Sequence, residues 1–82
     1  MQALRQIEAA EAALKALGFR QVRVRHHGDV AGIEVDGPEI NRLIAERERV
    51  VDAVRNAGYK FVSADLEGYS TGSLNRTWQP TR

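Results

Sequence analysis

The chain of 82 residues contains no cysteine. Disulfide bonds, thiolate nucleophiles and thiolate metal sites are therefore excluded. No stretch approaches the roughly 20 apolar residues that a membrane-spanning helix needs. The opening MQALRQIEAAEAALKALG is charged throughout, unlike a signal peptide. These absences predict a soluble, cytoplasmic protein that has no contact with a membrane.

An excess of charge of either sign is also missing, because 12 Lys and Arg residues stand against 11 Asp and Glu residues. Proteins that bind a phosphate backbone usually carry a basic excess on one face, so this balance argues against nucleic acid as a partner. The glycine motifs of nucleotide-binding proteins, the serine-nucleophile elbow and the HExxH motif are absent as well. The sequence thus carries no catalytic signature of its own.

What is present is the pattern of one small α+β domain. Apolar residues recur at helical spacing over 2–17, and Gly18 then offers a helix stop that accepts a positive φ. The segments 19–25 and 30–35 alternate between apolar and polar residues on either side of the turn HHGD. This alternation predicts a β-hairpin.

A second helix is predicted over 38–56, with a bend or break around 46–48, and a last strand over 60–66. The order α-β-β-α-β favours a three-stranded mixed sheet with both helices on one face. We expect the sheet order 2-1-3, with the third strand antiparallel to the first. Residues 1–69 would form the domain, and 70–82, rich in Gly, Ser and Thr, an irregular tail.

One face of this predicted sheet carries charge. The strand alternation turns the valines toward the core and the remaining side chains outward, namely Arg23, Arg25, Glu34, Ser63 and Asp65. Two interpretations stay open. The face is a solvated, self-neutralising network in which each exposed pair is worth about 0–1 kcal/mol. Alternatively, the arginines grip a phosphate or carboxylate, with the acids orienting them or holding a divalent metal.

A weaker candidate is a metal site near the hairpin turn. The side chains His26, His27, Asp29 and Glu34 are all of a type that ligates metals. Adjacent histidines beside a turn are also common as plain exposed residues, and this spacing matches no strong metal signature.

The stretches LGFRQVRVRHHGDVAGIEV (17–35) and GYKFVSADLEGYSTGSLN (58–75), with the helix between them, closely resemble the C-terminal domain of ATP-dependent sacrificial sulfur transferases. These LarE-type enzymes help make the nickel-pincer cofactor of lactate racemase. In that family an N-terminal PP-loop pyrophosphatase domain adenylates the substrate, and in many members a cysteine there gives up its sulfur. The C-terminal domain helps to build the oligomer, and its charged side faces the active site.

The resemblance implies that Arg23, Arg25, Glu11 and Glu34 lie near phosphate, substrate or a metal. Taken alone, the position of Glu11 beside the apolar stripe of the first helix also fits a solvated flank. The chain lacks the SGGxDS phosphate loop and the cysteine, so we do not expect it to adenylate or donate sulfur by itself. We expect a non-catalytic accessory domain without its own cofactor. It would self-associate, and it would share a nucleotide or a divalent metal with a separate PP-loop ATP pyrophosphatase-type protein.

Two other functions stay open. A small RNA-binding module would stack bases on exposed aromatic side chains of the open sheet, for which Phe19, Phe61 and Trp78 are the candidates. Trp78 could equally pack on the domain or on a partner. A stand-alone enzyme would use Arg23, Arg25 and the nearby acids for general acid–base work, and a metal-dependent activity of the purified domain would support it.

Overall fold

The computed structural model describes residues 2–68. Its elements are α1 (Gln2–Ala16), β1 (Val22–His27), β2 (Val30–Val35), the 3₁₀ turn η1 (Gly37–Glu39), α2 (Ile40–Ala45), α3 (Arg47–Asn56) and β3 (Phe61–Ala64). The predicted α+β class and the order α-β-β-α-β are confirmed. The predicted tail 70–82, with Trp78, lies outside the described residues. Within 2–68, no helix is long and apolar enough to cross a membrane.

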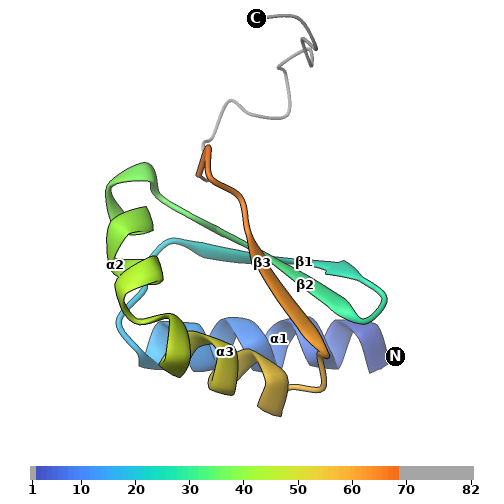
Figure 1. Cartoon of the computed structure of the whole chain (residues 1–82). Coiled ribbons are helices and arrows are strands. Elements are labelled where there is room, and N and C mark those ends of the chain that lie inside the picture. The colour runs from blue at the N-terminus through green and yellow to red at the C-terminus, as the bar shows by residue number, and fades with distance from the viewer. Residues whose placement is uncertain (1, 69–82) are drawn as a thin grey trace, which may run out of the picture.

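The domain has two layers, with the strands in one and the helices on a single face of the sheet (Figure 1). The core between them is apolar, and no polar or charged side chain within 2–68 is buried in it. The twelve buried hydrophobic residues come from every layer of the fold: Ala10, Leu14, Phe19, Val22, Val24, Ala31, Ile33, Val35, Leu43, Val50, Val54 and Tyr59.

The predicted break in the second helix is confirmed. Glu46, with φ −103° and ψ 27°, ends α2 and begins α3. The apolar stripe of an uninterrupted helix would continue through Arg47, whose side chain is exposed. The break redirects the chain so that Leu43 of α2 and Val50 of α3 both reach the core.

The helices α1 and α3 end in the same way. Gly18 (φ 104°) and Gly58 (φ 110°) adopt the left-handed conformation after the last turn, which favours glycine. Each is followed by a buried aromatic side chain, Phe19 or Tyr59. The glycine therefore stops the helix, and the aromatic residue anchors the entry to the next strand.

The strand order is β1-β2-β3 and not the predicted 2-1-3. β2 is central, with β1 antiparallel on one side and β3 parallel on the other. The expectation of a mixed sheet is confirmed, but the pairing of the third strand with the first was wrong. The helix α1 covers β1, and α3 packs beside α1 and against β3. Because α1 already occupies the β1 side, the short link after α3 delivers β3 to the far side of β2.

Candidate functional site

The surface of the sheet that faces away from the helices is organised in three rows across the strands. Register places one residue of each strand in each row, since partners in a ladder share a face. Asp65 continues β3 by one position, because its N–H donates to the Ile33 carbonyl at 2.9 Å. We call this surface the open face; its rows are Arg23–Glu34–Asp65, Arg25–Gly32–Ser63 and His27–Val30–Phe61.

The best-defined contact of the open face is an ion pair. Arg25 Nε donates to Glu34 Oε2 at 3.1 Å, with the arginine side chain 40% exposed and the glutamate 17%. Arg23 lies directly opposite Glu34 in the register. Glu34 therefore pairs with Arg25 and shares its row with Arg23, and strand alternation places both arginines on this face.

The middle of the open face is shallow because Gly32 has no side chain. A Cβ at Gly32 would lie 3.7 Å from atoms of Arg25, His27 and Ser63, so these three side chains surround it. The Ser63 hydroxyl donates to the Ala31 carbonyl at 3.3 Å. Asp65, at the rim, is exposed and accepts the Glu67 N–H through Oδ1 at 2.9 Å. Four of the five predicted binding residues, Arg23, Arg25, Glu34 and Asp65, are thus brought together.

The fifth, Glu11, lies elsewhere. It projects from α1 to the outer edge of β1, where its Oε2 accepts the backbone N–H of Val24 at 3.0 Å. Burial, and secondly the negative charge of Glu11, raise the pKa of Tyr59 above its usual value of 10. Glu11 is therefore on the helix side of the sheet, separated from the open face by the sheet itself.

The four candidate metal ligands are dispersed. His26 points to the helix side, where its Nδ1 is hydrogen bonded to the Tyr59 hydroxyl at 2.8 Å. His27 lies on the open face, and Asp29 Oδ2 in the turn is 3.9 Å from Lys60 Nζ. In the part of the chain that the structure describes, no three His, Asp or Glu side chains converge as a metal site would require.

The aromatic candidates for base stacking also separate. Phe19 is fully buried, whereas Phe61 is 63% exposed at a corner of the open face. Trp78 lies outside the described residues. Of the two stacking candidates within residues 2–68, only Phe61 therefore offers the face of its ring to a ligand.

Sequence reasoning did not single out Arg42, which contacts both α1 and its own helix. It donates to the carbonyls of Leu17 (3.2 Å) and Gly18 (3.4 Å), pairs with Glu39 (3.0 Å), and lies 4.1 Å above the Phe19 ring centroid. It thereby fastens α2 to the C-terminal end of α1. The spacing Glu39–Arg42–Glu46 predicts ion pairs within the helix. The same spacing does not predict the hydrogen bonds from Arg42 to the distant carbonyls.

These features define a class: a small α+β domain whose open face carries a compact charged cluster. The sequence is 39% identical over 72 residues to the pyridinium-3,5-bisthiocarboxylic acid mononucleotide synthase of Lactiplantibacillus plantarum. It is also 37% identical over 75 residues to an uncharacterised protein of Synechocystis sp.. These matches cover 88% and 89% of this chain, but 26% and 28% of the two relatives. No protein-family profile matches the chain.

Proposed function

We propose that this chain is a non-catalytic accessory and assembly domain that corresponds to the C-terminal part of the sulfur transferases. The observation that carries the proposal is the 39% identity over nearly the whole of this chain, but only about a quarter of the synthase. The rest of the relative's length has no counterpart among the 82 residues. We further propose that this domain self-associates, and that it meets a PP-loop ATP pyrophosphatase-type protein that carries out adenylation and sulfur transfer.

The open face is the surface proposed to meet that partner or a phosphate-like anion held by it. Its row Arg23–Glu34–Asp65 and the neighbouring Arg25 bring two guanidinium groups and two carboxylates together. Guanidinium groups fit phosphate oxygens in a bidentate manner. The carboxylates balance the charge, so a free anion must compete with Glu34 for Arg25. A nucleotide or pyrophosphate accompanied by a divalent cation would satisfy both kinds of group.

Titration of the isotope-labelled 82-residue chain with AMP, pyrophosphate and Mg²⁺ tests this proposal, with the amide and arginine side-chain NMR signals as the readout. We expect saturable shifts confined to the open face. The double variant Arg23→Gln/Arg25→Gln should abolish them while leaving the fold intact. The matched control Arg5→Gln/Arg20→Gln removes the same charge from exposed positions off the open face and should bind as the wild type does.

The variant Glu34→Gln sharpens the experiment. It releases Arg25 from its ion pair, so pyrophosphate without Mg²⁺ should bind about two- to fivefold more tightly, the range expected from breaking one surface ion pair. Absence of any shift at millimolar ligand in all variants would contradict anion binding. In that case the open face would be a solvated charge network, and the assembly role alone would stand.

A small RNA-binding module is the second candidate, and the exposed ring of Phe61 beside the arginine-bearing rows favours it. A base could stack there while Arg25 contacts the backbone. Single-stranded RNA should then bind with a steep salt dependence that Phe61→Ala reduces. Binding that is weak, and unchanged in Phe61→Ala, would remove this candidate.

A further inference from the structure

The outer edge of β3 presents backbone groups that no other strand among residues 2–68 pairs with. The N–H groups of Phe61 and Asp65 donate toward β2, to the carbonyls of Asp29 (3.1 Å) and Ile33 (2.9 Å). Because neighbouring residues of a strand point to alternate sides, the N–H and C=O groups of Val62 and Ala64 point away from β2. β3 ends the sheet on this side, so these groups form a template for another strand.

An apolar hollow of about 180 Å³ lies along the same edge, between β3 and the junction of α2 and α3. It is lined mainly by aliphatic side chains: Ile33, Leu43, Ile44, Val50, Val51, Val62 and Ala64. Ile44 is 49% exposed, which is high for a large aliphatic side chain. A strand added to β3 would turn every second side chain into this hollow.

We propose that a second copy of this chain occupies this edge, with the two β3 strands antiparallel about a twofold axis. The register that uses all outward backbone groups pairs Val62 with the partner's Ala64 and sets Ser63 against the partner's Ser63. Each copy then donates two N–H···O bonds. Val62 and Ala64 both lie on the helix side of the sheet, so this register keeps the two open faces on the same side of one continuous sheet.

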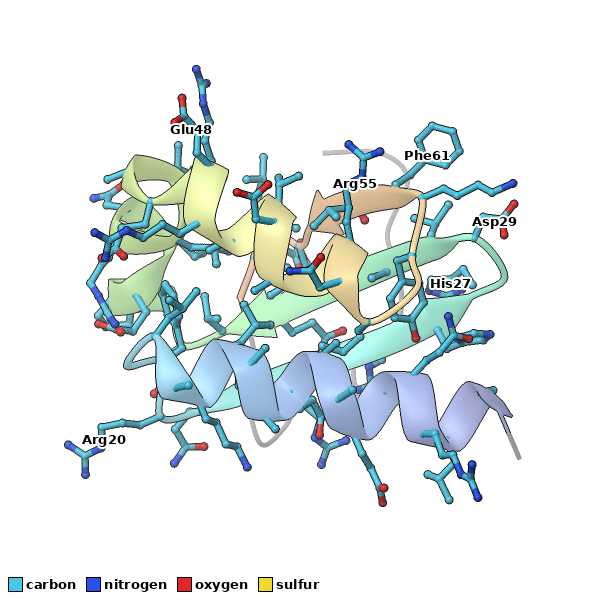
Figure 2. All side chains as sticks on the ribbon, turned by 90° about the horizontal axis from the view of Figure 1, so that it is seen from below. Arg20, His27, Asp29, Glu48, Arg55 and Phe61 are labelled. Carbon is cyan, nitrogen blue, oxygen red and sulfur yellow. The ribbon has the colours of Figure 1, made fainter. Side chains whose placement is uncertain are left out.

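The twofold axis also brings opposite charges of the two α3 helices together. Figure 2 shows Glu48, Arg55 and Phe61 on the edge of the domain opposite α1. The link between α3 and β3 is short, so Arg55 lies near the start of β3. Glu48 comes two helical turns earlier in α3 and lies toward the other end of β3 (Figure 2). An antiparallel pairing of β3 strands therefore brings Glu48 of each copy toward the partner's Arg55. This self-complementarity is what an isologous interface requires, and it favours a second copy over an unrelated peptide.

This interface rests on the proposed function, because it names the surface through which the proposed self-association takes place. It does not require the open face to bind anything, because it uses a different surface. A failed anion titration therefore leaves it standing, and a monomeric chain leaves the anion titration interpretable.

Sedimentation velocity of the full 82-residue chain over a wide concentration range tests the proposal. We expect reversible dimerisation. Glu48→Arg places like charges against the partner's Arg55 twice, and should raise the dimer dissociation constant about tenfold or more. The double variant Glu48→Arg/Arg55→Glu restores opposite charges and should recover most of the affinity. The matched control Glu8→Arg makes the same change at an exposed site on α1 and should have no effect.

The variant Ala64→Pro tests the strand pairing separately. It deletes an N–H that points outward and not toward β2, a position at which edge strands tolerate proline. The variant should fold, as its amide NMR spectrum would show, and should remain monomeric at concentrations at which the wild type dimerises. A wild type that stays monomeric, or a dimer that neither Glu48→Arg nor Ala64→Pro weakens, would overturn the proposal.

Discussion

The two edges of the sheet are treated differently. On the outer side of β1, the Glu11 carboxylate of α1 accepts the N–H of Val24 at 3.0 Å. Among the described residues no such side chain reaches the outer N–H groups of Val62 and Ala64 on β3, where Phe61 is 63% exposed. Edge strands that are neither covered nor charged tend to pair with other chains. The difference indicates that a side chain of the fold covers part of the β1 edge, at Val24, whereas no side chain of residues 2–68 covers the outward N–H groups of β3.

Core truncations on the two edge strands should show the largest difference. Val24 of β1 is 4% exposed, so Val24→Ala should destabilise the domain by about 2–4 kcal/mol through loss of buried area and a residual cavity. Val62 of β3 is only partly buried, and Val62→Ala should cost about 1 kcal/mol in the monomer. Urea unfolding at low protein concentration measures both changes. Equal costs would contradict the asymmetry between the edges.

Removal of the carboxylate that covers the β1 edge at Val24 should have a smaller effect. Glu11→Ala leaves the Val24 N–H without its acceptor and should cost about 1–2 kcal/mol, with faster hydrogen exchange at the Val24 amide. Glu11→Gln keeps an oxygen acceptor and should cost less. Glu8→Ala, at an exposed position of the same helix, should stay within about 0.5 kcal/mol of the wild type. Unchanged exchange at Val24 in Glu11→Ala would show that the contact does not protect this edge.

The smallest effect concerns alkaline pH. Burial and the charge of Glu11 raise the pKa of Tyr59 in the folded domain, while in the unfolded chain it titrates near 10. Below pH 10 the Tyr59 hydroxyl is neutral in both the folded and the unfolded state, so its ionisation does not change the free energy of unfolding. Above it the unfolded state ionises first, so the free energy of unfolding should fall as the pH rises toward the folded pKa. The difference between wild type and Tyr59→Phe, measured by urea unfolding between pH 8 and about 11, isolates this contribution. Parallel curves would contradict it.

The open face shows how far local patterns reach. Alternation in VRVR and in VAGIEV places Arg23, Arg25 and Glu34 on one face, and the structure confirms that grouping. The row that joins Arg23, Glu34 and Asp65 depends on β3 lying beside β2. The predicted order 2-1-3 placed β3 beside β1 instead. The alternation of residues within a strand fixes which side chains share a face, but not which strand lies next to it.

The contact of Glu11 could not be predicted from local patterns. The helical spacing of the first segment places this residue at the border of the apolar stripe, and both a solvated flank and a binding role fitted that position. The contact with the Val24 N–H exists only because α1 packs across β1 at that height. The same holds for Arg42, whose acceptors lie at the end of α1, 24 and 25 residues away in the chain.

The sequence alone determined the kind and order of the elements and the C-terminal ends of α1 and α3 to within a residue, but not the ends of the strands: β1 is Val22–His27 and not 19–25, and β3 is Phe61–Ala64 and not 60–66. Periodicity sets which residues of a helix or strand face the core, Gly18 and Gly58 stop the two helices, and both causes act within a few residues of the chain. The tertiary structure decided which elements become neighbours: the β1-β2-β3 order, the contact of Glu11 with the β1 edge, and the position of the β3 edge beside an apolar hollow. These depend on how α1 and α3 share one face of the sheet, since the side that α1 occupies leaves β3 only the opposite side of β2.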